Sequence, residues 1–276
     1  MRKELYLPMI ERALVEDLGG QGDITAESIF SPDDRSQATI VAKGEGVLAG
    51  IEVAESVFTK VNPLVSIQKF QIDGAKLTKG LDVLLVEGPT IDLLIAERTA
   101  LNFLGHMSGI ATATAKFVER VAGTKCQIAC TRKTNPGLRA VEKYAVRCGG
   151  GMNHRFGLYD AVLIKDNHIA AAGGAANALR AVKQRVGHLV KIEIEVTSFE
   201  LLQDVLDEGA DVIMLDNMTP DQCRQAISLI DGRAKVEASG GITLDTVREY
   251  AEAGVDIISV GWITHSAPRL DVSLEF

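Results

Sequence analysis

Two carboxylates, Glu195 and Asp216, stand at the ends of consecutive apolar runs of the chain. If both runs are strands of one parallel sheet, their carboxyl ends converge and both acids point into one site. Acids in that position can hold Mg²⁺, bind sugar hydroxyls or stabilise a developing oxocarbenium ion. The alternative is an ion pair with Lys165 or Lys191 that only ties strands together. The functional interpretation is favoured, because an apolar strand has no structural need to end in an acid twice running.

The chain is acidic as a whole but basic in one stretch. It has 29 Lys and Arg against 37 Asp and Glu, whereas residues 131–165 contain seven basic residues and two acidic ones. Lys143 and Arg147 have the spacing of a solvated helix face. A cationic pocket in an acidic protein predicts a small ligand with several negative charges. The basic residues that end apolar runs, where loops begin, are Arg132, Lys133, Arg155 and Lys165.

Glycine-rich turns follow the last two apolar runs, as Ser239-Gly240-Gly241 and Ser259-Val260-Gly261. Barrels often bind phosphate at this position on backbone N–H groups. A tight turn alone would also call for glycine, so the residues leave both interpretations open. Gly149-Gly150-Gly151 gives a loop the freedom to bring His154 and Arg155 inward.

The elements that position these residues alternate regularly along the second half of the chain. Strands are predicted at 127–130, 161–164, 191–196, 211–215, 234–238 and 256–260, and helices near 137–148, 174–186, 198–208, 220–229 and 244–253. This alternation predicts right-handed βαβ units and a parallel sheet. Polar or glycine residues follow every strand, which is typical of a barrel mouth, and no G-x-G-x-x-G marks a dinucleotide-binding sheet. About six strands make an incomplete α/β barrel.

The first half predicts a different architecture. A helix at 7–18 precedes alternating segments at 38–51, 65–70 and 81–87, which indicate a small, largely antiparallel layer. A helical stretch from 92 to 120, broken near Ser108-Gly109, leads into the barrel. We therefore predict an N-terminal open-faced α/β layer domain over 1–108 and a barrel over 109–265, with the tail 266–276 packed back on the first domain.

Composition excludes several classes of protein. The net charge of −8 and 5% aromatic residues argue against nucleic-acid binding. No apolar run reaches the roughly 18 to 20 residues of a membrane span. Four scattered cysteines predict a reducing cytoplasm, and Cys126 and Cys130 fit a buried strand without a metal. No P-loop, nucleophile elbow or H-E-x-x-H is present.

At these same residues the sequence resembles the quinolinate phosphoribosyltransferases (carboxylating nicotinate-nucleotide pyrophosphorylases), and the likeness runs through almost the whole chain. The motifs that carry it are Glu16-Asp-Leu-Gly-Gly-x-Gly-Asp-Ile-Thr25, Glu97-Arg-Thr-Ala-Leu-Asn102, Ser108-Gly-Ile-Ala-Thr112, Thr131-Arg-Lys-Thr134, Glu142-Lys-Tyr-Ala-Val146, Gly149-Gly-Gly-Met-Asn-His-Arg155, Leu163-Ile-Lys-Asp-Asn-His168, Leu215-Asp-Asn217 and Glu237-Ala-Ser-Gly-Gly-Ile242.

The resemblance implies a type II phosphoribosyltransferase with Mg²⁺ as cofactor. Such an enzyme joins quinolinate to phosphoribosyl pyrophosphate and releases pyrophosphate and CO₂, giving nicotinate mononucleotide. It also implies a homodimer, or an assembly of dimers, with shared active sites. Trp262 departs from the smaller residue expected there, and Arg139 matches a family arginine whose helical position fits a structural role equally well.

The resemblance also implies a role for each matching residue. Arg132, His154 and Arg155 would hold the quinolinate carboxylates, with Arg98 supplied by the partner subunit. Lys133 and Lys165 would bind anionic groups of the donor, and Glu195 and Asp216 its ribose and Mg²⁺. Thr131, Ser239, Gly240, Gly241, Ser259, Val260 and Gly261 would complete the substrate contacts, the last six around the 5-phosphate.

Three other functions remain open from the residues alone. A relative such as the paralogue associated with molybdate transport would use the same scaffold on another substrate. A Schiff-base aldolase would use Lys165, and borohydride trapping would reveal it. A non-catalytic phosphate-ligand binder is disfavoured by the paired acids, from which an anion receptor gains nothing.

Overall fold

All 276 residues are described in the computed structural model, and they divide into two compact units. The first unit contains Met1–Ala115, Thr134–Gly150 and Trp262–Phe276, and the second contains Lys116–Lys133 and Gly151–Gly261. The domain boundary between residues 108 and 109 stays a prediction.

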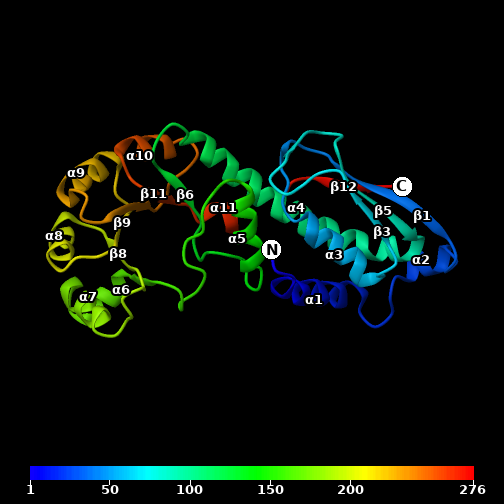
Figure 1. The fold of residues 1–276 in the computed structure, drawn as a ribbon, viewed down its shortest axis with the longest axis horizontal. Helices are drawn as coiled ribbons and strands as arrows, with labels where there is room; N and C mark the ends of the chain where they lie inside the picture. Colours follow the sequence, from blue (N-terminus) through cyan, green and yellow to red (C-terminus); the bar gives the residue numbers. More distant parts are fainter. The chain divides into compact units, whose positions relative to one another are not determined.

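The second unit is built on a six-stranded sheet in which every neighbouring pair is parallel (Figure 1). The strand order is β6-β11-β10-β9-β8-β7, and the sheet is not closed. This confirms the mixed α/β architecture with six parallel strands. The strands are β6 (Gln127–Ala129), β7 (Val162–Ile164), β8 (Ile192–Val196), β9 (Val212–Asp216), β10 (Lys235–Ser239) and β11 (Ile257–Ser259).

Helices connect these strands, and capping residues mark several of their ends. The predicted helices at 174–186 and 244–253 are shorter in the structure, and the helix Asp166–Ala172 was not predicted. Ser198 accepts a hydrogen bond from the Leu201 backbone N–H, and Thr219 forms a capping box with Gln222. Gly209 and Gly254 follow two of the helices with positive φ angles of 80° and 98°, which glycine adopts without strain. The helices are α6 (Asp166–Ala172), α7 (Ala175–Lys183), α8 (Phe199–Glu208), α9 (Pro220–Ile230) and α10 (Val247–Ala253).

The first unit contains a four-stranded antiparallel sheet in the order β12-β1-β5-β3. The C-terminal strand β12 (Val272–Glu275) pairs with β1 (Arg35–Ala42), and β5 (Asp82–Pro89) and β3 (Ser66–Lys69) complete the sheet. The segment 38–51 is not one alternating strand, because it divides into β1, the short β2 and the start of a helix. The remaining elements are η1 (Lys3–Leu5), α1 (Leu7–Leu18), α2 (Ile24–Ile29), β2 (Gly46–Val47), α3 (Ile51–Val61), β4 (Lys76–Leu77), α5 (Arg139–Cys148) and α11 (Trp262–His265).

The predicted break near Ser108-Gly109 is wrong, since α4 (Thr90–Arg120) runs unbroken for 31 residues. Its glycines serve close packing instead. A Cβ on Gly109 would lie 2.2 Å from the carbonyl oxygen of Pro268, and one on Gly105 would lie 2.8 Å from that of Leu270. The backbone of the C-terminal segment therefore approaches the helix closely at two positions that carry no side chain. None of the helices combines the length and apolarity that crossing a membrane requires.

Candidate active site

A cavity of about 630 Å³ lies at the carboxyl ends of the six parallel strands, entirely within the second unit. It gathers every predicted site residue except Arg98, Val260 and Gly261. Sequence reasoning did not single out Leu163, Asp166, Met214 and Asn217, which also line it. The lining residues are Thr131, Arg132, Lys133, His154, Arg155, Leu163, Lys165, Asp166, Glu195, Met214, Asp216, Asn217, Ser239, Gly240, Gly241 and Ser259.

The two predicted acids have different partners in the wall of the cavity. Glu195 forms an ion pair with Lys165, while Lys191 pairs with Asp211 at 2.5 Å. Oδ2 of Asp216 accepts a hydrogen bond of 2.8 Å from the side-chain amide of Asn217. The ion pair foreseen as a structural alternative for Glu195 thus exists, but both of its members line the cavity and can meet a ligand there.

Arg155 lines the cavity and has a buried side-chain donor without a partner. Its Nη1 donates to the carbonyl oxygen of Ala161 at 3.0 Å, and its buried Nε has no hydrogen-bond partner within the chain. Burial lowers the pKa of the guanidinium, and the charge of Arg132 lowers it further. A buried donor without a partner is costly, so a carboxylate or phosphate entering the cavity would relieve that cost.

The turn after β10 has a backbone conformation that favours glycine at two successive positions. Gly240 and Gly241 have φ angles of 98° and 63°, and a Cβ on Gly240 would lie 2.2 Å from Oδ1 of Asn217. Only glycine fits that position. In the second glycine turn, the Val260 backbone N–H donates to the carbonyl oxygen of Ala129 at 2.9 Å. The phosphate-binding roles of both turns stay predictions.

The predicted site residue His154 contacts two buried acids that sequence reasoning missed. Its Nε2 lies 3.0 Å from Oε2 of Glu193 and 3.6 Å from Oε1 of Glu237. The three ligand atoms lie within 4.8 Å of one another, a donor set that could hold a metal ion. The available signal was the pattern Ile-Glu-Ile-Glu-Val in β8, whose alternation turns Glu193 and Glu195 to the same face.

Arg98 and His168 do not line the strand-end cavity. Arg98 lies on α4 in the first unit, where its side chain is 65% exposed and lines a hollow with Asp23, Thr25 and Glu97. His168 accepts a hydrogen bond of 2.9 Å from the Lys165 backbone N–H and thereby helps to orient the loop that carries this lysine.

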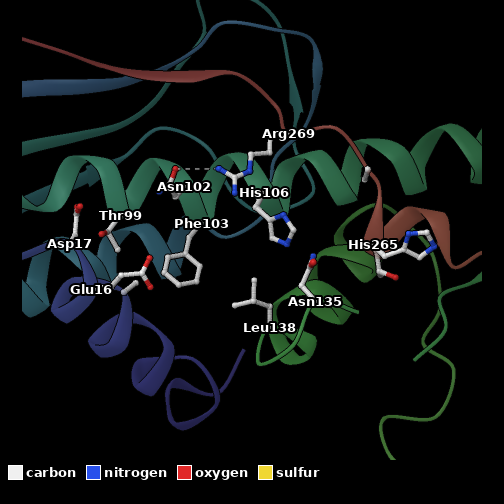
Figure 2. Close-up of a pocket in the computed structure, with 13 residues that line it drawn as sticks. Glu16, Asp17, Thr99, Asn102, Phe103, His106, Asn135, Leu138, His265 and Arg269 are labelled. Carbon is white, nitrogen blue, oxygen red and sulfur yellow. Dashed lines mark hydrogen bonds between the residues drawn. The ribbon is translucent and has the colours of Figure 1, made fainter. Parts of the chain in front are cut away.

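A second hollow of about 520 Å³ lies in the first unit (Figure 2). Asn102 accepts a hydrogen bond of 3.4 Å from Arg269, and the buried Glu142 binds both His106 and Asn135, at 2.9 and 2.7 Å. Sequence reasoning did not foresee this hollow. Residues of two family motifs that the strand-end cavity does not use line it, namely Glu16, Asp17, Thr99 and Asn102.

Comparison with known proteins agrees with this arrangement. Residues 23–108 match the model of the quinolinate phosphoribosyl transferase N-terminal domain, and residues 110–275 match that of the C-terminal domain. The chain is 44% identical over 267 residues to the probable nicotinate-nucleotide pyrophosphorylase (carboxylating) of Bacillus subtilis, covering 97% of this chain and 92% of that protein. It is 44% identical over 274 residues to the nicotinate-nucleotide pyrophosphorylase (carboxylating) of Mycobacterium leprae, covering 96% and 95%.

Solved structures show the same relationship. The crystal structure of NadC from Streptococcus pyogenes superposes with a TM-score of 0.96 at 41% identity, over 100% of this chain and 97% of that one. The nicotinate-nucleotide pyrophosphorylase of Francisella tularensis superposes with a TM-score of 0.95 at 37% identity, over 100% and 97%. The family models and the relatives cover nearly the full chain, and the chain therefore belongs to the quinolinate phosphoribosyltransferase family.

Proposed function

We propose that this protein transfers the phosphoribosyl group of phosphoribosyl pyrophosphate to quinolinate. The products are nicotinate mononucleotide, pyrophosphate and CO₂, and the reaction belongs to NAD biosynthesis. The observation that carries the proposal is one cavity that joins a cluster of cations to two carboxylates at parallel strand ends, in a full-length member of the family. Quinolinate and the donor are both anionic, as the charge of the cavity requires.

Different cations of the cavity bind the two substrates. Arg132 and Arg155 hold the quinolinate carboxylates, because a guanidinium matches a carboxylate with two parallel hydrogen bonds. His154 lines the same cavity, and its two ring nitrogens face Glu193 and the Arg155 backbone N–H. Lys133 and Lys165 bind anionic groups of the donor, and Thr131 orders the turn by accepting a hydrogen bond of 3.0 Å from the Lys133 backbone N–H. The turns Ser239–Gly241 and Ser259–Gly261 surround the 5-phosphate with backbone N–H groups.

Catalysis requires no covalent nucleophile. As pyrophosphate departs, positive charge grows on the ribose, and the carboxylates of Glu195 and Asp216 stabilise it electrostatically. The pyridine nitrogen forms the new bond to the ribose carbon and becomes a pyridinium. When the adjacent carboxylate leaves as CO₂, its bonding electron pair stays on the ring carbon, where the neighbouring pyridinium charge stabilises it until the carbon takes up a proton from solvent. The clamp on the second carboxylate keeps the ring in place throughout.

The donor set of the cavity suits Mg²⁺. Glu195 and Asp216 offer carboxylate oxygens on neighbouring strands, and Mg²⁺ is commonly bound by one or two carboxylates together with substrate phosphates. When bound, the ion would neutralise charge on the departing pyrophosphate.

We further propose that the active protein is a homodimer, or an assembly of dimers, in which Arg98 enters the partner's cavity. Its high exposure and its absence from the lining of the strand-end cavity support this assignment. Reciprocal donation of one residue fits a twofold dimer. All four cysteines are free, which supports a reducing compartment such as the cytoplasm.

The Schiff-base alternative requires a free amine on Lys165, and this nitrogen is engaged by Glu195 in the cavity wall. One assay tests the proposed function: formation of nicotinate mononucleotide from quinolinate and phosphoribosyl pyrophosphate, followed by chromatography. We expect product that depends on both substrates and accumulates with an equal amount of CO₂. Absence of product from folded protein, or a lysine adduct trapped by borohydride, would overturn the proposal.

A further inference from the structure

Two glutamates inside the second unit have no role in the proposed reaction. Glu193 on β8 and Glu237 on β10 are 7% and 2% exposed, and each keeps one carboxylate oxygen, Oε1, without a hydrogen-bond partner. Neither residue lines the strand-end cavity. Glu193 precedes the cavity residue Glu195 by two positions in the strand, which places it one inward-facing position deeper in the sheet.

Stability gives no reason for these acids. The inward positions of such strands are ordinarily filled by Val, Ile or Leu, which pack without desolvating a charge. Replacing buried ionic groups with apolar residues of similar volume is often neutral or stabilising. Burial and, after it, the negative charge of Glu193 raise the pKa of Glu237 to about 8, so the pair is electrostatically strained. Packing alone therefore does not account for acids at these two positions.

Their common contact is His154. Its Nε2 faces Oε2 of Glu193 at 3.0 Å, and its Nδ1 accepts a hydrogen bond of 2.8 Å from the backbone N–H of Arg155. The ring is thereby fixed at both nitrogens, with its N–H turned toward the acids. The hydrogen bond to Nδ1 also holds the backbone of Arg155 in place, and Arg155 lines the cavity. A chain of contacts thus leads from the buried acids through the imidazole to the anion clamp.

We propose that Glu193 and Glu237 are positioning residues for the quinolinate half of the site, acting through His154. This inference rests on the proposed function. The acids hold the imidazole in one orientation, and the imidazole holds the backbone from which Arg155 reaches the substrate carboxylate. In the proposed function His154 and Arg155 belong to the quinolinate half of the site and not to the donor half, so the affinity for phosphoribosyl pyrophosphate should not depend on this support.

The test compares Glu193→Gln with the unchanged protein in steady-state kinetics for each substrate separately. Loss of one charge-assisted hydrogen bond to the imidazole predicts a rise of about 10- to 100-fold in KM for quinolinate. The KM for phosphoribosyl pyrophosphate and kcat at saturating quinolinate should stay unchanged. Glu237→Gln should act in the same direction with a smaller effect, because its oxygen lies farther from Nε2, and it serves as the second variant if Glu193→Gln does not fold.

A double-mutant cycle separates positioning from independent effects. In a His154→Ala background, Glu193→Gln should raise the KM for quinolinate no further. An equal rise in both backgrounds would overturn the proposal, as would an unchanged KM for quinolinate in the single variant. Asp211→Asn is the control, since this acid binds Lys191 and the Ile192 backbone at the other end of β8, and only stability should fall. If the unchanged protein binds no quinolinate, the proposed function fails instead.

Discussion

The ammonium nitrogen of Lys165, which follows β7, forms an ion pair with Oε1 of Glu195 on β8. Each group neutralises the other in the cavity wall. Under the proposed function, a donor phosphate that attracts Lys165 would leave the Glu195 carboxylate free to face the ribose, and binding of the donor would expose the negative charge that the chemistry requires.

Removing either charge of the acid pair should impair turnover more than folding. Glu195→Gln and Asp216→Asn keep the side-chain size, and we expect kcat to fall by about 10²-fold or more because transition-state charge stabilisation is lost. Dependence on Mg²⁺ should weaken in both variants. Kinetics with phosphoribosyl pyrophosphate as the varied substrate measure this, and circular dichroism verifies the fold. Unaltered kinetics in both variants would show that these acids have a structural role and not a catalytic one.

Nicotinate should be a very poor substrate. If Arg132 and Arg155 hold two carboxylates, a substrate with one leaves part of a half-buried cationic site without its anion. That loss costs roughly 2 to 5 kcal/mol, which corresponds to about 30-fold to several thousand-fold in kcat/KM. Parallel assays with quinolinate and nicotinate give the ratio, and comparable turnover of the two would contradict the assignment.

Mixed dimers should regain activity that both parent variants lack. Arg98→Ala and Lys133→Ala each remove a cation, and each is expected to be nearly inactive alone. After co-refolding in equal amounts, about half of the dimers are mixed by random pairing. In each mixed dimer, the Arg98→Ala subunit keeps its own Lys133 and receives Arg98 from the partner, whereas the other site carries both defects.

One good site in half of the dimers predicts about a quarter of the activity of the unchanged protein. The control is each variant refolded alone at the same total concentration. A mixture that stays as inactive as its parents would mean that Arg98 acts within its own chain, or outside the site altogether.

Neighbouring glycines in the turn after β10 should respond differently to alanine. A Cβ at Gly240 would meet Oδ1 of Asn217 at 2.2 Å and its backbone nitrogen at 2.9 Å, whereas one at Gly241 meets no atom within 4 Å. Both have positive φ, so both variants carry a backbone cost of about 1 kcal/mol. Gly240→Ala should in addition displace Asn217 and raise the KM for phosphoribosyl pyrophosphate. Equal effects of the two substitutions on this KM would contradict the close packing of the turn against Asn217.

The free energy of unfolding should decrease as pH rises, because Glu237 ionises. Burial raises the pKa of its carboxyl group from 4.5 to about 8 in the folded protein. Between these values the folded state binds more protons than the unfolded state, so the free energy of unfolding decreases as pH rises. The contribution is complete below pH 4.5 and is lost as pH passes through about 8, with a slope of at most about 1.4 kcal/mol per pH unit.

Urea unfolding of the unchanged protein and of Glu237→Gln at pH 6 and pH 8.5 isolates this group. The variant should gain relative stability at the higher pH, since glutamine cannot ionise. A stability difference that is the same at both pH values would show that Glu237 does not titrate in this range.

Sequence alone determined the parallel strands, most of their helices and the residues at the strand ends. These features follow from local physics: the apolar alternation of β8, the capping box at Thr219 and the glycine at 209 act within a few residues of chain. Because all parallel strands end at one edge, Glu195 and Asp216 could be placed in one cavity without knowing the register.

Tertiary structure decided what depends on distant segments. The glycines of α4 gave a helix-breaking signal, but their role is fixed by the segment 268–270, which packs against them from the other end of the chain. The contact of His154 with Glu193 and Glu237 joins a loop to two strands that are not neighbours in the sheet. Strand order and register determine that these three side chains lie together. Both acids are buried, and a buried charge is stable only beside a group that compensates it, which the histidine provides here.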